Sequence, residues 1–585
     1  MSLQTLNDIF FTIAGWNQPR FMLRKCATGW EPISSHDFAT KVNGVVSGLR
    51  SWGISRGDRV AILSENRHEW VVADFASMLL GAVVVPIYTT LTADQTCELL
   101  CDSGARAIFA SSEKHLEKIF SIQHRTSLER IVVMNAIDDS GISQMKELMQ
   151  LPADGQPGAI GRAVQADDLA TIIYTSGTTG VPKGVMLTHG NMASNINYFC
   201  RDFGFQGGLT CISFLPLSHV TARCVDLGLI SQGVTLAHLP QIDQLPQTLL
   251  ELRPHILLSV PRVYEKVHTQ VEIKAAAFPH KQIYQWALRT GRTHRNEILA
   301  GKTPTSMAWK LADLLVFSKV RAGVGGRVRI FISGGAPLGH NLAEWYADIG
   351  LRICEGYGLT ETSPVIAVNT PMAHRIGSVG KPLGNVEVRV AEDGEILVRG
   401  PSIFKSYWNK PEETQNAFVD GWFKTGDIGR IDEDGFLYVT DRKKDLLKTS
   451  GGKFIAPQPI EGALKHHPLI AEAVIVGDKR RFPSVLIFPN FAALETYAQQ
   501  ESLRFSSRDE LVHTPEIQAR YADIVSALNE GLAQFEKLKK FCVVADELSP
   551  ANGTMTASLK LRRRVIEEHY REQIETMYEA AEVAR

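Results

Sequence analysis

The chain has 585 residues, of which 44% are hydrophobic, and its 62 basic and 63 acidic side chains give a formal net charge of -1. A length of this order allows about three or four domains. The near-neutral charge excludes a global field that would attract nucleic acid or an anionic membrane, so phosphate groups must be bound locally, by loops and a few cations.

The start of the chain, MSLQTLNDIFFTIAGW, lacks the basic beginning and the small-residue cleavage site of a secretory signal. The most apolar segment, residues 71–88, contains Asp74 and Gly81, which favours a buried helix followed by a strand over a bilayer-spanning helix of ~20 apolar residues. Eight cysteines occur without any CxxC spacing, a pattern typical of reduced core thiols. We therefore expect a cytoplasmic location, with peripheral attachment to the inner membrane face as the alternative.

The first half of the chain alternates strand-like and helix-like segments. Strands are predicted at 59–66, 82–87 and 105–111, with helices at 69–80 and 92–104 between them. Near-continuous apolar strands separated by amphipathic helices indicate βαβ units and parallel sheets that are covered on both faces. The further strand candidates lie at 169–175, 210–216, 234–239, 255–260 and 327–333.

The segment TIIYTSGTTGVPKGVMLTHGN (171–191) joins a predicted strand to a predicted helix through a loop of glycine and hydroxyl residues. Glycines allow backbone N–H groups to crowd round an anion, the hydroxyls add donors, and a lysine adds a mobile charge. The segment has no GK[ST] ending, so it is not a Walker A loop, and the lack of a GxGxxG after a first strand disfavours a dinucleotide oxidoreductase. The loop predicts a phosphate cradle formed by Thr175, Ser176, Gly177, Thr178, Thr179, Gly180 and Lys183.

Two long stretches are predicted to be helical: residues 260–326, and residues 491–540 nearer the end of the chain. Between them, after about residue 380, the pattern changes to hairpins that turn at Asp393-Gly394 and at Asp434-Gly435. The acidic run that ends at Gly435 superficially resembles a calcium loop, but it lacks the remaining ligand positions, which favours a turn. We expect the main domain boundary after Asp441, followed by a smaller mixed α/β region.

Six further motifs accompany the phosphate loop: FLPLSHV (214–220), ISGGAPL (332–338), EGYGLTE (355–361), GWFKTGDIG (421–429), YVTDRKKDLLKTSGGKFIAP (438–457) and SLKLRRR (558–564). Together, and in this order, they resemble the adenylate-forming superfamily of acyl-CoA synthetases, luciferases and peptide-synthetase adenylation domains. The resemblance covers roughly residues 30 to 570. The helical stretches and the ENRHEW and SGGKFIAPQPIE segments look most like bacterial long-chain fatty-acid–CoA ligases, because short-chain and aryl-acid ligases are much shorter at 260–326.

The resemblance implies an α/β fold with a large N-terminal adenylation domain at 1–441, built from two α/β sheet subdomains and a small β-barrel. A hinge at 442–446 would connect it to a mobile α+β domain at 447–585. The implied reaction converts a long-chain fatty acid and ATP to an acyl-adenylate and then to fatty acyl-CoA, AMP and pyrophosphate, with Mg²⁺ as the metal. The partners are small molecules (fatty acid, ATP and CoA) and no nucleic acid; the oligomer, monomer or dimer, is left open.

The resemblance also implies roles for single residues. The Gly334–Ala336 part of ISGGAPL would lie against the adenine. Tyr357 would stack on the base, and Thr360 would contact the α-phosphate. Asp427 and Arg442 would bind the ribose, while Glu361, with Thr178, would hold the metal. The nucleotide site therefore adds Gly334, Gly335, Ala336, Glu355, Gly356, Tyr357, Gly358, Asp427 and Arg442 to the phosphate loop.

Lys560 matches the mobile catalytic lysine of the superfamily. A cation held against the reacting phosphate stabilises the charge that builds up on it; outside this context, a solvated lysine in a basic run would be the better interpretation. The hinge aligns with Lys444, and domain rotation would exchange Lys560 for a CoA-framing loop of Ser450, Gly451, Gly452 and Lys453. His219 and Val220 would lie near the carboxylate end of an acyl tunnel. The Arg562–Arg564 run also suggests a weak peripheral contact with anionic lipid.

Three other functions stay open. A fatty-acyl-AMP ligase that loads a carrier protein, or a ligase for medium-chain or aryl acids, would use the same nucleotide site. The first usually carries an insertion in the SGGAP–YGLTE region that this chain lacks between Gly335 and Tyr357. A catalytically silent fatty-acid or nucleotide-binding protein would not need the charged set of Glu361, Asp427, Arg442 and Lys560.

Overall fold

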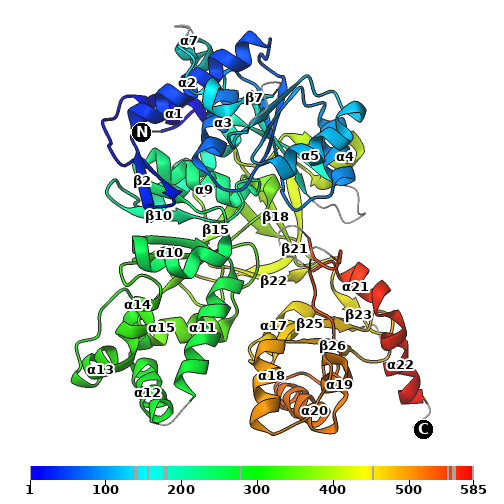
Figure 1. Cartoon of the computed structure of the whole chain (residues 1–585). Helices are drawn as coiled ribbons and strands as arrows, with labels where there is room; N and C mark the ends of the chain where they lie inside the picture. The colour runs from blue at the N-terminus through cyan, green and yellow to red at the C-terminus, as the bar shows by residue number, and fades with distance from the viewer. Residues whose placement is uncertain are drawn as a thin grey trace.

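The structure is a computed structural model of the whole chain, and it describes residues 2–137, 142–153, 157–175, 182–276, 279–450, 453–549, 552–556 and 561–582. Figure 1 shows a large upper body that contains the N-terminus, a lower helical arm and, beside that arm, the C-terminal part of the chain. Two large sheets form the upper body and give it the α/β character expected from the sequence.

The first large sheet has eight strands in the order β19-β9-β8-β4-β3-β5-β6-β7. Strands β4, β3, β5, β6 and β7 are parallel, β8 joins them parallel to β4, and β9 and β19 are antiparallel additions. Their bounds are β3 Arg59–Leu63, β4 Val83–Ile87, β5 Ala107–Ala110, β6 Arg130–Val133, β7 Ser143–Gln144, β8 Leu169–Thr175, β9 Lys183–Thr188 and β19 Ser406–Tyr407.

The second large sheet has nine strands in the order β16-β15-β14-β13-β12-β10-β11-β1-β2. Strands β14 to β1 in this order are parallel, and β15, β16 and β2 are antiparallel edges. The bounds are β1 Met22–Cys26, β2 Gly29–Ile33, β10 Thr210–Ser213, β11 Thr235–His238, β12 Ile256–Ser259, β13 Ile330–Ser333, β14 Ile353–Gly358, β15 Val365–Val368 and β16 Lys381–Pro382. All the strands predicted in the first half are therefore confirmed.

The helices of the upper body fill the space between and around these sheets. One hydrophobic core contains Phe75 of α3, Ile196 of α8 and Val225 of α9 together with Val84 and Leu236 from the two sheets, so the sheets share a core. The segment 71–88 is the end of α3 followed by β4, as predicted. The helices are α1 Asn7–Ala14, α2 Ser35–Ser51, α3 His68–Leu79, α4 Ala93–Ser103, α5 Glu113–Ile122, α6 Met145–Leu148, α7 Pro157–Arg162, α8 His189–Phe203 and α9 Val220–Ser231.

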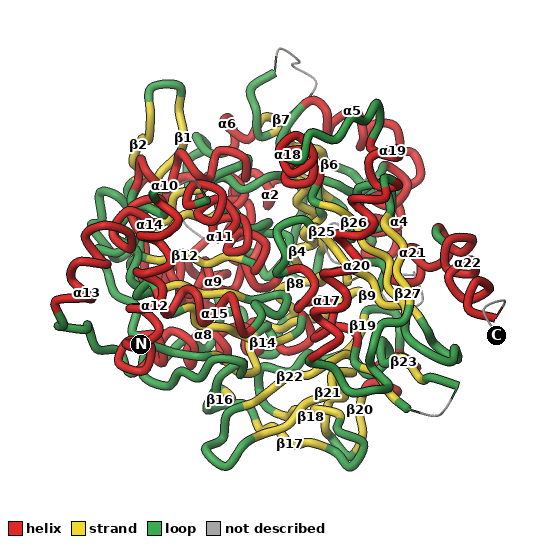
Figure 2. The backbone as a smooth tube through the Cα atoms, turned by 90° about the horizontal axis from the view of Figure 1, so that it is seen from below, coloured by secondary structure: helices red, strands yellow, loops and turns green. Residues whose placement is uncertain are grey.

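The stretch 260–326 forms the helical arm. Its helices share a second core with β12, β13 and β14 that includes Tyr264, Trp309 and Phe331, and α13 lies at the outer edge of the molecule (Figure 2). The helices of this stretch are α11 Pro261–Ala275, α12 His280–Leu299, α13 Met307–Ala312, a π-helix at Asp313–Phe317 and α14 Ser318–Gly323, and it is flanked in sequence by α10 Leu245–Leu252 and α15 His340–Asp348.

A five-stranded antiparallel sheet follows, in the place where the sequence predicts hairpins and a small β-barrel. Val390 pairs with Ile396 across the first hairpin, and Ile431 pairs with Leu437 across the second, which confirms both turns. Arg375 binds Asp432 and Asp434 at 2.5 and 2.7 Å, so these two carboxylates stabilise a turn. The elements are β17 Glu387–Val390, β18 Glu395–Arg399, α16 Pro411–Ala417, β20 Phe418–Val419, β21 Trp422–Ile431 and β22 Leu437–Arg442.

The C-terminal part is the smaller mixed α/β region expected. A three-stranded sheet packs against helices around a core of its own that includes Ile475, Leu494 and Tyr521. Among the described helices of the whole chain, none is both long and apolar enough to span a bilayer. The elements are β23 Leu447–Lys448, β24 Phe454–Ile455, α17 Pro457–Lys465, β25 Ile470–Val476, β26 Ser484–Pro489, α18 Phe491–Gln500, α19 Arg508–His513, α20 Pro515–Glu530, β27 Lys540–Val543, α21 Arg563–His569 and α22 Arg571–Glu582.

Candidate nucleotide site

The glycine–threonine segment connects two antiparallel strands. Thr175, at the end of β8, pairs with Lys183, the first residue of β9, so these two strands are antiparallel neighbours. The other predicted phosphate contacts lie outside the described residues: Ser176, Gly177, Thr178, Thr179 and Gly180. The ends of this β8–β9 hairpin hold Thr175 and Lys183 side by side.

The prediction of a helix directly after Lys183 is wrong. Residues Lys183–Thr188 form β9, with Val185 and Leu187 fully buried, because this segment pairs along the whole length of β8. The helix α8 begins only at His189, after a capping box in which Thr188 and Asn191 satisfy each other's backbone N–H groups.

The segments around Gly334 and Tyr357 lie on neighbouring strands of the second sheet. Ser333 at the end of β13 pairs with Glu355 on β14, which places Gly334, Gly335 and Ala336 beside β14. Gly335 has a φ of +85°, and a Cβ on Gly334 would meet nothing closer than the Gly356 carbonyl oxygen, at 3.7 Å. The positive φ explains why residue 335 is glycine. At residue 334 the protein itself would leave room for a Cβ, so the missing side chain leaves open space beside β14.

Two further positions on β14 matter to the site. A Cβ on Gly358 would lie 1.7 Å from the Pro364 carbonyl oxygen, so only glycine fits there. Burial raises the pKa of Glu355 to about 7, although the Leu338 backbone N–H opposes the shift. A carboxyl with this pKa offers both a donor and an acceptor near neutral pH.

Tyr357 connects the second large sheet to the five-stranded sheet. Its hydroxyl donates to Asp427 Oδ2 at 2.6 Å, and Arg442 Nε lies 2.9 Å from Asp427 Oδ1. Asp427 is 2% exposed and pairs with Arg442 across β21 and β22. The expected ribose pair is thus brought together with the expected base-contacting tyrosine, and Asp427 is the centre of the group.

Glu361 lies in the 3-10 turn Thr360–Thr362 that follows β14. Its Oε1 accepts a hydrogen bond of 2.8 Å from the hydroxyl of Tyr407, and the Lys183 Nζ lies 5.2 Å from the centroid of the same ring. Tyr407 joins the phosphate-loop hairpin through β19, where it pairs with Val185. Sequence reasoning missed Tyr407, because nothing in the local SYW sequence distinguishes it from a core residue.

Lys444 interacts electrostatically with both groups of residues, the Asp427–Arg442 pair and Lys183. Burial lowers the pKa of Lys444; nearby Arg442 and Lys183 lower it further, while Asp445 and Asp427 raise it. The proposed hinge lysine therefore lies within the field of both the ribose pair and the phosphate-loop hairpin.

The expected acyl residues lie at the start of α9. His219 is the N-cap residue, and its Nδ1 accepts from the Thr221 backbone N–H at 3.2 Å; Val220 is buried. Helix α9 contributes to the core shared by the two large sheets. The structure thus gives His219 a capping role, and its contact with an acyl group stays a prediction.

The expected CoA loop is part of a second, short hairpin. Lys448 pairs with Phe454, and the Ser450 backbone N–H donates to the Arg480 carbonyl at 2.8 Å. Lys453 closes the turn, because its N–H donates to Thr449 Oγ1 at 3.2 Å. The predicted CoA-loop residues Gly451 and Gly452 lie outside the described residues.

Lys560 also lies outside the described residues, but the arginines after it are described. Arg563 binds Glu461 at 2.8 Å and donates to the Ile475 carbonyl, with 16% of its side chain exposed. Arg563 therefore points into the C-terminal domain, and the suggested contact of this run with anionic lipid stays a prediction for the other two arginines. Arg562 and Arg564 are both exposed, and 84% of the Arg564 side chain is accessible.

Comparisons with known proteins agree with this geometry. Residues 17–408 match the AMP-binding enzyme family, and residues 444–582 match the AMP-binding enzyme C-terminal domain. The long-chain-fatty-acid–CoA ligase FadD15 of Mycobacterium tuberculosis is 37% identical over 558 residues, covering 94% of this chain and 92% of that protein. The human long-chain-fatty-acid–CoA ligase ACSBG2 is 29% identical, covering 94% and 88%.

Solved structures agree on the fold. The adenylation domain of a carboxylic acid reductase from Segniliparus rugosus, in complex with AMP and a carboxylic acid, superimposes with a TM-score of 0.75 at 21% identity, covering 99% of this chain and 94% of that one. A Mycobacterium tuberculosis fatty acyl CoA synthetase gives 0.63 at 23% identity, covering 97% and 98%. The chain belongs to the family of AMP-binding enzymes.

Proposed function

We propose that the chain is an ATP-dependent, AMP-forming ligase that converts a long-chain fatty acid to its CoA thioester through an acyl-adenylate. The observation that carries the proposal is the convergence of Tyr357, Asp427 and Arg442 on one side and Lys183 and Glu361 on the other, with Lys444 in the field of both. The 37% identity to a long-chain-fatty-acid–CoA ligase over 94% of the chain supports the substrate class.

The chemistry explains why such a site is needed. A carboxylate is a poor electrophile, and its oxygen is a poor leaving group. The carboxylate oxygen attacks the α-phosphorus of ATP, the bond between that phosphorus and pyrophosphate breaks, and pyrophosphate leaves. The oxygen now bridges the acyl carbon and AMP in a mixed anhydride, from which AMP can leave. The CoA thiol then attacks the anhydride carbon, the thioester forms, and AMP leaves with the electron pair of the broken bond.

The described side chains suit the nucleotide half of this reaction. The two carboxylate oxygens of Asp427 fit the two ribose hydroxyls, with Arg442 as a donor beside them. Glu355, with a pKa of about 7, can donate to a ring nitrogen or accept from an amino group of adenine. Lys183 and the phosphate-loop hairpin would bind the phosphates, and Thr360 would contact the α-phosphate.

A magnesium ion fits Glu361. Oε1 of Glu361 accepts from Tyr407, and among the described residues its other carboxylate oxygen has no hydrogen-bond partner, so it is available as the hard oxygen ligand that Mg²⁺ prefers. Glu361, together with Thr178, would hold the ion, which would neutralise phosphate charge during the transfer. Tyr407 would fix the orientation of the carboxylate.

The two half-reactions favour a division of the chain at residues 442–446. In this division, residues 1–441 bind ATP, and residues 447–585 deliver Lys560 for adenylation and the Ser450–Lys453 loop for thioester formation. Lys444 lies in sequence between Asp427 and the β23–β24 hairpin that begins at Leu447, a position that suits a hinge. The Gln458 backbone N–H donates to Asp441 Oδ2 at 3.3 Å, and such a rotation would change this hydrogen bond.

Pyrophosphate release tests the proposal. The full chain should release pyrophosphate from ATP with long-chain fatty acids, and CoA should convert the bound adenylate to thioester. Equal turnover without CoA but with an acyl carrier protein would indicate a carrier-loading ligase, and preference for medium-chain or aryl acids would revise the substrate class. Binding of ATP and fatty acid without pyrophosphate release would indicate a silent binding protein and overturn the proposal.

A further inference from the structure

A second polar cavity lies at the opposite end of the strands that form the nucleotide site. It has a volume of about 780 Å³ and is bounded by the starts of β12, β13 and β14 and by the helical arm. His255, Arg329 and Arg352 directly precede these three strands. A four-residue strand spans about 13 Å, so the cavity is separate from the loops that contain Gly334 and Glu355.

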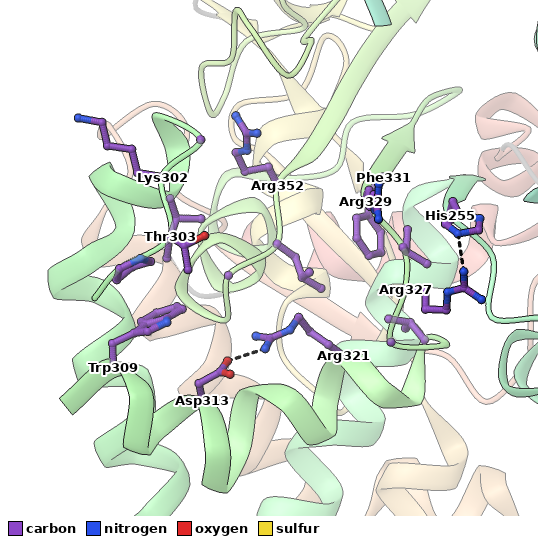
Figure 3. A pocket seen from close by; sticks show the side chains of 18 residues that line it. His255, Lys302, Thr303, Trp309, Asp313, Arg321, Arg327, Arg329, Phe331 and Arg352 are labelled. Carbon is purple, nitrogen blue, oxygen red and sulfur yellow. Dashed lines mark hydrogen bonds and ion pairs between the residues drawn. The ribbon is translucent and has the colours of Figure 1, made fainter. Parts of the chain in front are cut away.

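The lining of this cavity is strongly basic. Figure 3 shows Lys302, Arg321, Arg327, Arg329 and Arg352 around it, with Asp313 as the one carboxylate among the lining residues. Asp313 binds Arg321 at 2.5 Å. In the described parts of the chain the other four cations have no carboxylate within ion-pair distance, although Arg352 donates to the Leu299 and Pro371 carbonyls.

His255 adds a geometric reason for an anion. Its Nδ1 accepts from the Thr210 backbone N–H at 3.1 Å, and its Nε2 lies 3.0 Å from Arg327 Nη2. A neutral imidazole has one lone pair and one N–H, and arginine has no acceptor. Since Nδ1 uses the lone pair, the Nε2–H and the Arg327 N–H face each other as two donors, and an anionic oxygen beside them would accept from both.

Two aromatic side chains also line the cavity. They are Trp309 and Phe331, and both belong to the core of the helical arm. A cavity lined by both aromatic and cationic side chains suits a molecule that combines an apolar or aromatic part with phosphate groups.

We propose that this cavity is a binding site for a phosphate-bearing small molecule, with Arg327, Arg329 and His255 as its phosphate contacts. The ligand is a phosphate ester or a diphosphate, and it can come from a soluble nucleotide or from the headgroup of an anionic phospholipid. The site is separate from the nucleotide site of the proposed reaction.

The test compares the wild-type chain with Arg327→Ala/Arg329→Ala. A matched control, Lys310→Ala/Lys319→Ala, removes two exposed cations of the same arm that do not line the cavity. The protein is first saturated with AMP and then titrated with inorganic pyrophosphate by calorimetry. We expect the affinity of one pyrophosphate site to fall by about tenfold or more per arginine removed, as for lost hydrogen bonds to charged groups, and the control to match the wild type.

A second arm identifies the source of the phosphate. Cosedimentation with phosphatidylglycerol vesicles should fall in the cavity variant if the ligand is a lipid headgroup, whereas the pyrophosphate titration alone changes if it is soluble. Pyrophosphate should also protect Arg327 and Arg329 from phenylglyoxal in the wild type. The proposal is overturned if the variant keeps its pyrophosphate-release activity, matches the wild type in both the pyrophosphate titration and the cosedimentation, and neither arginine is protected from phenylglyoxal.

Discussion

Tyr357 donates its hydroxyl hydrogen to Asp427, 2.6 Å away, and so connects the nine-stranded sheet to the five-stranded sheet. Seventy residues separate the two in the chain. The hydrogen bond fixes the orientation of a carboxylate that is 2% exposed, and it leaves Arg442 on the other carboxylate oxygen. Base-contacting and ribose-contacting residues therefore form one unit in the proposed site.

Removing the Tyr357 hydroxyl should weaken ATP binding. Tyr357→Phe keeps the ring but removes a hydrogen bond to a charged group, which contributes about 1.5–3 kcal/mol, so the KM for ATP should rise about tenfold or more. Tyr438→Phe is the matched control. Tyr438 lies on the five-stranded sheet that contains Asp427, and its hydroxyl donates to another carboxylate, Asp432, at 3.1 Å. An unchanged KM in Tyr357→Phe would mean that Asp427 does not need this orientation.

Glu361→Gln should separate metal binding from folding. The amide oxygen can still accept from Tyr407, but the charge that would hold Mg²⁺ is lost. We expect acyl-AMP formation to fall by about 10²–10³-fold, in the range seen for removal of one stabilising group, and the Mg²⁺ requirement to rise. Tyr407→Phe should have a smaller effect with the charge retained. A wild-type Mg²⁺ titration for Glu361→Gln would remove this residue from the metal site.

Lys560→Ala should divide the two half-reactions. Acyl-AMP formation, measured by pyrophosphate exchange, should be abolished because the cation beside the reacting phosphate is lost. Acyl-AMP that is supplied to the enzyme should still be converted to the thioester. Arg564→Ala, four residues away and strongly exposed, is the control. Equal loss of both half-reactions in Lys560→Ala would count against domain alternation.

Arg563→Met should destabilise the C-terminal domain. The change leaves the buried Glu461 without its partner, and breaking a buried pair in this way costs about 3–5 kcal/mol. Urea unfolding of the full chain should show the C-terminal transition at lower denaturant. The double variant Arg563→Met/Glu461→Met should recover much of the loss, whereas equal stability of Arg563→Met and the wild type would show that the pair contributes little.

Asp441 should make stability depend on pH. Burial raises its pKa from 3.8 to about 6, so the folded state favours the neutral acid. The free energy of unfolding should therefore fall as the pH rises from about 4 to 6, by about 3 kcal/mol in total. Asp441→Asn keeps an acceptor but does not ionise, so its curve should lack this decline. Parallel curves for the two proteins would contradict the assignment.

Much of the fold could be predicted from local sequence. The strands and helices of the first half, both hairpins and the helical arm follow from hydrophobic period and turn residues, which act between near neighbours in the chain. The helix predicted after Lys183 failed because β9 is stabilised by its pairing with β8, and a six-residue segment contains no local signal for that partner.

The order of the motifs by itself determined the family and named Tyr357, Glu361, Asp427 and Arg442, because these residue types occur in characteristic local segments. Only the tertiary structure decided that Tyr407 orients Glu361, that Arg563 turns inward to Glu461, and that a basic cavity lies at the far ends of β12 to β14. Each of these relationships joins segments that are distant in the chain. Their contact depends on strand order and packing, which local sequence does not encode.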